Sequence, residues 1–415
     1  MAGEYEHEAV PAHAKRSLFS VAAVWAGFPL VMIGAFVGGE IVNSLGFTRG
    51  MEAIVVGNLI LAVYVAFLSA LAAQESKTFG LSAKYLFGPV AARFVSITLS
   101  SLVVGWFAVQ TGLAGTGVVQ LTGLPPGIST LLIGIVFIIM SLSGMRILKP
   151  LSIFSILLFT AVGIVSLIIN FTHGSVQQML AFQPDSHRSV SFGVGLTMVI
   201  SCFIDSGTLT ADFTRWSKTP SQAVIASLCA FPLGNMIPML LGGIVVASQN
   251  SSSGDFSLLL GQWGPTMAAF GALFFVVNCS SVAVHGLYNA TAGWSALFPL
   301  SFKSMTITLG IIGLILALSG ITNWLTNWLE LLGILVPGIG GAIMGWMLSR
   351  VRQYTPKTMA LAWVFSILIG VIVNLWLPEL STAVVVIVTS MIISLIGSLM
   401  SHPQRRTSEH KRNLS

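Results

Sequence analysis

Charged residues are scarce in this chain. Asp, Glu, Lys and Arg together make up 8% of the 415 residues, while 55% are hydrophobic. A soluble domain carries about 25% charged residues, so a soluble globular protein is excluded. The composition indicates an all-α, polytopic membrane protein. Its excess of basic residues fits the charge bias of membrane-protein loops, and we expect no nucleic-acid partner.

Cysteine is also rare, and the sequence motifs of common enzymes are missing. Cys202, Cys229 and Cys279 lie in apolar runs at unrelated spacings, which predicts neither a disulfide framework nor a metal cluster. The chain contains no HExxH, no GxSxG and no paired-histidine motif. We therefore expect neither an enzyme nor a bound cofactor.

Long apolar runs fill the rest of the chain. A membrane helix needs roughly 20 apolar residues, and we predict twelve transmembrane helices joined mostly by short connections. Residues 1–17 read as a retained polar tail without a signal-peptide cleavage site, and 402–415 as a basic tail. The predicted spans are 18–45, 51–73, 91–118, 129–145, 149–171, 191–214, 221–248, 263–290, 304–320, 322–349, 358–377 and 380–401.

Basic residues give the orientation of these spans. With both termini in the cytoplasm, 17 of the 19 lysines and arginines fall in cytoplasmic loops or tails, and only Arg49 and Arg188 fall outside. This matches the enrichment of Lys and Arg in cytoplasmic loops. We expect a multi-pass protein of the bacterial inner membrane with both termini inside.

Two predicted spans are interrupted by residues that weaken helices. Span 18–45 contains Gly27, Pro29 and Gly34, and span 191–214 contains the polar stretch DSGT. Each opens a group of five spans, which predicts inverted repeats at 18–171 and 191–349 followed by two extra helices at 358–401. Transporters of this kind bind substrate near the membrane midplane at such breaks. The alternative is that Gly and Pro are simply frequent in membrane helices.

Asp205 lies in the second interruption. An aspartate at the bilayer centre costs about 2.5–3.5 kcal/mol on insertion scales, so it should face the bundle interior or a water-filled cavity. It suits an N–H-rich substrate, a proton or a cation; the alternative is a structural hydrogen bond. A carboxylate accepts hydrogen bonds only, which favours an amino-substituted or cationic ring.

Further candidates lie on three predicted helices. Trp106 and Gln110 share a helix face and suit a flat heterocycle, and Phe203 provides a possible second aromatic wall. Asn278 and Ser281 also share a face, and their oxygens suit Na⁺. For each of these, ordinary core packing or backbone bonding is the alternative reading. The same choice, between gating or proton transfer and a structural role, holds for Glu40, His285 and Glu330.

Four blocks resemble the cytosine permeases of the nucleobase–cation symport family, which are related to the hydantoin transporters. They are FVGGEIVNSLGF, VGWF, FIDSGTLTADFTRW and NCSSVAVHGLY, in the family's order and spacing. The resemblance implies a LeuT-like five-plus-five inverted-repeat fold with broken helices 1 and 6. It also implies a cation symporter in the lipid bilayer, and we expect this protein to be a monomer.

The resemblance also implies roles for individual residues. Trp106 and Phe203 match the aromatic residues on the two faces of the substrate ring, Gln110 matches a substrate-binding glutamine, and Asn278 a substrate-facing asparagine. The matching sodium site consists of the backbone near Gly27 and Leu30, the carbonyl of Asn278 and the hydroxyl of Ser281.

The chain departs from the cytosine permeases at the residues that read the substrate edge. It has Asp205 where they have serine, Val103 where they have glutamine, and Val282 where they have a second sodium-binding hydroxyl. We therefore expect import of a nucleobase-like heterocycle with Na⁺ as the coupling ion and H⁺ as the alternative. A thiamine precursor, a hydantoin or allantoin is an alternative substrate, and an amino-acid transporter of the same fold is a more distant one.

Overall fold

The computed structural model describes residues 5, 8–26, 29–143, 145–173, 175–184, 189–251, 253–295, 298, 300–350 and 356–401. Within these ranges eight helices are long and apolar enough to cross a membrane. Four shorter apolar helices accompany them: Met32–Leu45, Pro126–Leu142, Phe192–Ser201 and Phe302–Leu318. The chain is thus a polytopic helical membrane protein, and the number of twelve spans stays a prediction.

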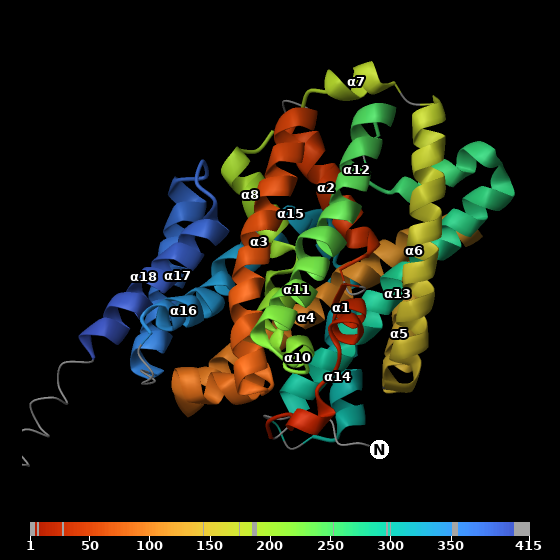
Figure 1. The fold of residues 1–415 in the computed structure, drawn as a ribbon. Coiled ribbons are helices and arrows are strands. Elements are labelled where there is room, and N and C mark those ends of the chain that lie inside the picture. The colour runs from red at the N-terminus through yellow and green to blue at the C-terminus, as the bar shows by residue number, and fades with distance from the viewer. Residues whose placement is uncertain are drawn as a thin grey trace, which may run out of the picture.

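The helices follow one another with short connections (Figure 1). Their order is α1 (Leu18–Ala26), α2 (Met32–Leu45), α3 (Phe47–Glu75), α4 (Phe79–Thr122), α5 (Pro126–Leu142), α6 (Met145–His173), α7 (Val176–Leu180), α8 (Phe192–Ser201), α9 (Ile204–Thr208), α10 (Ala211–Thr214), α11 (Pro220–Leu228), α12 (Asn235–Gln249), α13 (Pro265–Ser295), α14 (Phe302–Leu318), α15 (Leu325–Leu335), α16 (Pro337–Leu348), α17 (Pro356–Trp376) and α18 (Thr382–Met400). Four short helical turns complete it: η1 (Ala12–Ala14), η2 (Cys229–Gly234), η3 (Phe256–Trp263) and η4 (Ile321–Trp324).

Both spans with interrupted sequences are divided in the structure. In the first, α1 ends at Ala26 and α2 begins at Met32, after Val31 in an extended conformation with φ −139° and ψ 155°. In the second, α8 ends at Ser201 and α9 begins at Ile204, after Phe203 with φ −137° and ψ 20°. A broken helix frees backbone N–H and C=O groups that need partners inside a membrane.

Helix α4 extends further toward its N-terminus than the sequence predicts. The predicted span begins at 91, whereas the helix begins at Phe79 and bends at Gly88, where φ is 75° and ψ 165°. Glycine adopts this positive φ without steric cost, and Pro89 cannot donate a hydrogen bond across the bend. Hydropathy therefore detects the part beyond the bend and misses the helical segment before it.

Small residues bring α2 and α12 into backbone contact. A Cβ atom on Gly38 would lie 2.0 Å from the carbonyl oxygen of Met239, and one on Gly242 would lie 1.9 Å from that of Ala35. Neither position has room for a side chain. Close approach through small residues is a common way for membrane helices to associate. The half of the first broken span that lies beyond the break is thereby fixed against α12.

The N-terminal segment is fastened to one end of the molecule, the lower end in Figure 1. The Lys15 ammonium donates to the hydroxyl of Ser76 at 2.6 Å and to the carbonyls of Arg215 at 2.8 Å and Ala73 at 3.4 Å. Burial lowers the pKa of Lys15 from its ordinary value of 10.5, and these bonds offset the lost hydration. The N-terminal segment, the α3–α4 turn and the residues after α10 therefore meet at one face.

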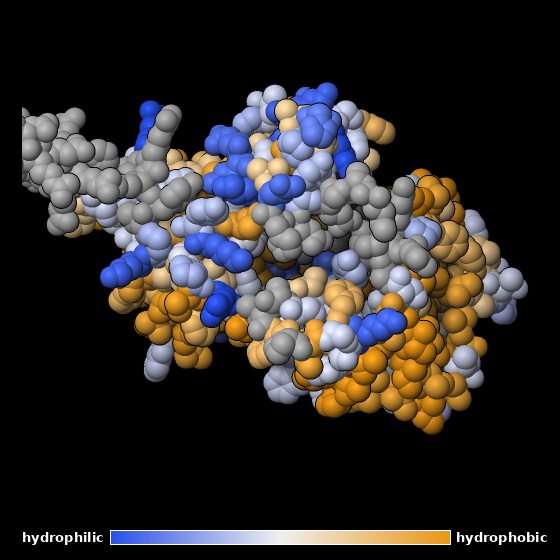
Figure 2. Space-filling model, turned by 90° about the horizontal axis from the view of Figure 1, so that it is seen from below, coloured by the Kyte–Doolittle hydropathy of each residue, from blue (hydrophilic) through white to orange (hydrophobic). Residues whose placement is uncertain are grey.

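This lower face is more hydrophilic than the flanks of the molecule. Figure 2 shows polar residues gathered around a hollow, with apolar residues at the sides. The last two helices, α17 and α18, lie at one edge of the bundle beside α16 (Figure 1). Helices α5 and α6 lie at the opposite edge. Apolar flanks and a polar end face suit a protein whose sides contact lipid.

Candidate functional site

A cavity lies where the two broken helices face α4 and α13. It collects side chains from α2, α4, α13 and the stretch that joins α8 to α10. The lining residues are Ile33, Val103, Trp106, Cys202, Phe203, Asp205, Ser206, Leu209, Val282, Gly286 and Asn289. Three of the five predicted substrate-binding residues, Trp106, Phe203 and Asp205, therefore line one cavity.

Aromatic side chains form two of its walls. Trp106 is 6% exposed and lies edge-to-face with Trp328 of α15, with ring centroids 6.3 Å apart and an interplanar angle of 90°. Gly105 makes this contact possible, because a Cβ atom there would come within 2.2 Å of the Trp328 ring. Phe203 packs against Phe231 at a centroid distance of 6.0 Å. Both cavity aromatics are thus held in place by other aromatic rings.

The Asp205 carboxylate is buried in this cavity and only half satisfied. Oδ1 accepts from the backbone N–H of Ser206 at 2.7 Å and from its hydroxyl at 3.3 Å. The indole of Trp106 faces the same carboxylate. Oδ2 has no hydrogen-bond partner among the residues that the structure describes. A buried, unpaired oxygen is costly, so Oδ2 is a ready position for a ligand or a proton.

Two of the predicted substrate residues do not line the cavity. Gln110 lies one turn from Trp106 on α4 and is 1% exposed, and its amide nitrogen has no partner within the described ranges. Asn278 uses its side chain elsewhere: Oδ1 accepts from the backbone N–H of Met32 at 2.8 Å, and Nδ2 donates to Ser155 at 2.9 Å. Asn278 therefore satisfies a backbone group freed by the first break. The roles of both residues in substrate binding stay predictions.

The predicted sodium-site residues surround the same break. Gly27 lies outside the described residues, and Leu30 is half-buried just before α2. Ser281 is 7% exposed, and its backbone carbonyl lies 2.7 Å from Nδ1 of His285. Val282, which follows it, has no side-chain oxygen. Within the described ranges, no three His, Cys, Asp or Glu residues are grouped to hold a metal ion.

Sequence reasoning missed two polar residues of the cavity, Ser206 and Asn289. Asn289 lies on α13 with Val282 and Gly286, at spacings of four and three residues that place them on one helix face. Its carboxamide both donates and accepts hydrogen bonds. This spacing is visible in the sequence, but only the packing of α13 against the breaks tells which face of the helix meets the cavity.

The cavity is narrow in this conformation. Water can occupy about 40 Å³ of it, which is room for about three water molecules. In this conformation the cavity thus has room for little more than a few water molecules.

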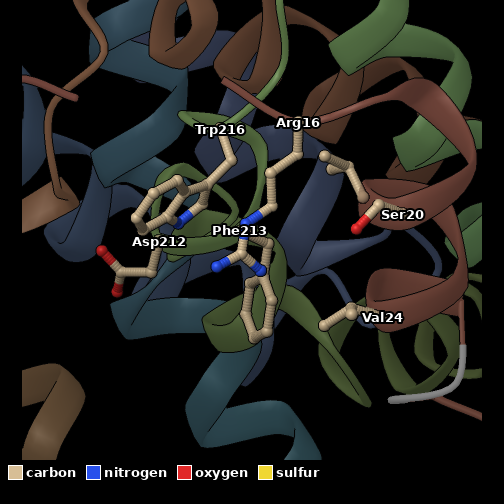
Figure 3. Close-up of a pocket in the computed structure, with 7 residues that line it drawn as sticks. Arg16, Ser20, Val24, Asp212, Phe213 and Trp216 are labelled. Atoms are coloured by element: carbon tan, nitrogen blue, oxygen red, sulfur yellow. The ribbon is translucent and has the colours of Figure 1, made fainter. Parts of the chain in front are cut away.

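A second cavity opens at the lower end of the molecule, between α1 and α10 (Figure 3). It is lined by Arg16, Ser20, Val21, Val24, Asp212, Phe213 and Trp216, and water can occupy about 120 Å³ of it. The Arg16 guanidinium lies 4.6 Å from the centroid of the Trp216 ring. This cavity is larger, but the first one lies at both helix breaks and is therefore the candidate substrate site.

Comparisons with known proteins identify the family of the chain. Residues 10–402 match the model of a family described as permeases for cytosine/purines, uracil, thiamine and allantoin. The cytosine permease of Escherichia coli (strain K12) is 27% identical over 384 residues, which cover 89% of this chain and 88% of that protein. The cytosine permease of Escherichia coli O157:H7 is similar to the same extent.

Three solved structures share the fold. The inward-facing conformation of Mhp1 superposes with a TM-score of 0.77 at 17% identity, covering 96% of this chain and 93% of that one. Mhp1, a nucleobase-cation-symport-1 family transporter, in a closed conformation with bromovinylhydantoin bound gives 0.72 at 16% identity, with 95% and 94% covered. A Na⁺-coupled sialic acid symporter in its substrate-bound outward-open state gives 0.67 at 14% identity, with 96% and 92% covered. The chain belongs to the family of permeases for cytosine/purines, uracil, thiamine and allantoin.

Proposed function

We propose that this permease is a secondary transporter that carries a nucleobase-like heterocycle into the cell together with a cation, by alternating access. One observation carries the proposal: an aromatic-walled cavity with a buried, half-satisfied carboxylate lies at the breaks of two helices. Transporters built from repeats bind substrate at such breaks. The family is one of permeases, which supports transport rather than catalysis.

The substrate ring lies between Trp106 and Phe203, and polar groups read its edge. Base–aromatic stacking is worth about 1–3 kcal/mol per base in other proteins, and it tolerates any flat ring. Selectivity therefore comes from Asp205 and from Ser206 and Asn289 beside it. Cytosine or a purine is the first candidate, in line with the names of the relatives. A thiamine precursor, a hydantoin or allantoin is the second.

Gln110 and Asn278 join the site only after a change of conformation. Gln110 lies a turn from Trp106 with an unpaired amide nitrogen, so a small rotation of α4 brings it toward the ring. Asn278 has to exchange its bond to Met32 for one to the substrate. Both movements agree with a cavity that widens to admit a ring.

If the coupling cation is Na⁺, its site lies between the first break and α13. Its ligands are backbone oxygens near Gly27 and Leu30, the carbonyl of Asn278 and the hydroxyl of Ser281. Na⁺ coupling in one structural neighbour supports this ion, and H⁺ is the other candidate. Ser281→Ala should abolish Na⁺ stimulation of substrate binding. A wild-type protein that ignores Na⁺ removes the sodium site from the proposal.

The architecture that we propose has twelve spans in a bacterial inner membrane, with both termini cytoplasmic and a monomer as the working unit. The repeats comprise 18–171 and 191–349, followed by two extra helices at 358–401. The meeting of the N-terminal segment, the α3–α4 turn and the end of α10 at one face supports this topology. Twelve spans place all three on the cytoplasmic side.

The test is a ligand screen followed by exchange transport. Purified protein is heated with cytosine, adenine, hypoxanthine, allantoin, hydantoin or hydroxymethylpyrimidine, with and without Na⁺, and alanine and leucine serve as controls. Compounds that raise the melting temperature are then tested for counterflow in proteoliposomes. We expect one class of heterocycle to stabilise the protein and to exchange. Stabilisation by an amino acid and by no heterocycle contradicts the proposal.

A further inference from the structure

Asp205 is an acidic residue without a cationic partner in the substrate cavity. The described residues that line the cavity include no lysine, arginine or histidine. The side chain is 1% exposed, and Oδ2 has no hydrogen-bond partner within the described ranges. A buried lone charge is so costly that such a group neutralises instead. Binding a proton is the neutralisation open to Asp205 when no cationic ligand is present.

The surrounding elements do not supply a counter-charge either. The other titratable groups on elements that pack against α9 or line the cavity are Cys202 beside α9, Glu40 on α2, Arg49, Glu52, Tyr64 and Glu75 on α3, Lys84, Tyr85 and Arg93 on α4, Cys279, His285 and Tyr288 on α13, and Glu330 on α15. Tyr64, Glu330 and His285 have hydrogen-bond partners of their own. Helix α16, which also packs against α9, has no titratable residue. No lysine or arginine of these elements reaches the cavity lining.

The proposed sodium site is at the same time poor in side-chain oxygen ligands. Val282 follows Ser281 on α13 and offers no hydroxyl, and the side chain of Asn278 is engaged by Met32 and Ser155. The expected Na⁺ site thus lacks a hydroxyl at position 282. The substrate cavity, in contrast, contains a carboxylate oxygen of Asp205 that has no hydrogen-bond partner within the described ranges. This inference rests on the proposed function. We propose that Asp205 binds the coupling ion, which is a proton, and that the transporter is therefore a proton symporter.

Protonation changes what Asp205 offers to the substrate. Oδ1 is held by Ser206, so the ring meets Oδ2. With the proton, Oδ2 becomes an O–H donor that bonds a ring nitrogen or a carbonyl oxygen. Without it, Oδ2 repels the same acceptor. The substrate class is therefore a heterocycle that presents an acceptor at this edge, such as the imine-type nitrogen of an aminopyrimidine.

This arrangement couples the two cargoes without any chemical reaction. The proton favours substrate binding, and by reciprocity the substrate favours proton binding. Both are released together on the cytoplasmic side, and no covalent bond forms or breaks. Above the pH at which Asp205 loses its proton in the substrate-free protein, the substrate affinity should fall by about tenfold per pH unit, because one proton binds with each substrate molecule.

The experiment uses proteoliposomes in Na⁺-free buffer with the labelled compounds that exchange in the wild type. We expect an inside-alkaline pH gradient to drive accumulation, a protonophore to abolish it, and a Na⁺ gradient at equal pH to drive none. Asp205→Asn keeps the size of the side chain and offers an N–H in place of the O–H. It should retain exchange within about threefold of wild type and lose accumulation. The control variant Glu379→Gln, at an exposed carboxylate outside the cavity lining, should keep pH-driven accumulation.

A second measurement covers the case in which Asp205→Asn does not fold. Above the pH at which the substrate-free protein loses the Asp205 proton, substrate added to wild-type protein in weakly buffered solution should cause uptake of about one proton per molecule bound. Absence of this uptake, or accumulation driven by Na⁺ and indifferent to pH, overturns the inference and leaves the proposed function intact. If no compound of the screen exchanges in the wild type, the proposed function fails and this inference with it.

Discussion

Asn278→Ala should remove the side-chain hydrogen bond that stabilises the first helix break. Asn278 is 1% exposed and accepts a hydrogen bond from the backbone N–H of Met32, a residue 246 positions away that begins α2. Val31, the N-cap residue of α2, provides no side-chain cap. Asn278, although it lies on α13, therefore caps the N-terminus of α2, as a serine or aspartate at the N-cap position does for other helices. It also donates to Ser155 of α6 at 2.9 Å.

The two hydrogen bonds set the size of the effect. Truncation leaves the N–H of Met32 buried and unpaired, which costs about 1–3 kcal/mol, and removes a second bond worth about 1 kcal/mol. We expect Asn278→Ala to lower the free energy of unfolding by about 2–4 kcal/mol. Ser155→Ala is the matched control, because it removes only the second bond and should cost about 1 kcal/mol.

The assay is unfolding of the three purified proteins in detergent, followed by substrate binding at several Na⁺ concentrations. Asn278→Ala should melt well below Ser155→Ala and should also bind substrate more weakly, because α2 carries Ile33 of the cavity. Equal melting of the two variants would refute the reasoning, since it would mean that the bond to Met32 does not hold the break.

Two further predictions concern the substrate ring and the N-terminal segment. Trp106→Ala should weaken substrate binding at least about tenfold, and Trp106→Phe should weaken it less; calorimetry on correctly folded protein measures both, and unchanged affinity removes Trp106 from the site. Lys15→Met removes donors to Ser76 and Arg215, so hydrogen exchange at residues 210–217 should quicken while exchange in α13 stays unchanged. Unaltered exchange at 210–217 would show that Lys15 does not fasten this face.

Much of the fold follows from local sequence, and its exceptions have physical causes. The predicted span 51–73 lies within α3, and 263–290 nearly coincides with α13, because continuous apolar runs suit only lipid or a packed core. The helical segment before Gly88 escaped because it lies beyond a bend and contains polar residues. Hydropathy detects segments that are apolar enough for a membrane. This segment is less apolar, and its helical structure depends on tertiary contacts.

The candidate site divides in the same way. Trp106 and Asp205 were predictable because each is chemically unusual where it stands: a tryptophan in mid-span and a carboxylate within an apolar run. Asn289 and the bond from Asn278 to Met32 were not, because both depend on how α13 packs against segments far away in the sequence. The chemical character of a residue can be predicted from the local sequence, whereas its hydrogen-bond and packing partners depend on the fold.

The contacts on the two sides of the first break differ in kind, and from this difference we predict which of them changes when substrate binds. Beyond the break, α2 touches α12 through backbone atoms at Gly38, which leaves no room to slide. Before it, α1 meets the α10 region through side chains, chiefly the stacked rings of Trp25 and Phe213 at 4.2 Å. Side chains change rotamers at lower cost than backbones separate. We expect spin-label distances between α1 and α10 to change on substrate binding while those between α2 and α12 stay constant; the opposite result would place the moving wall at α2.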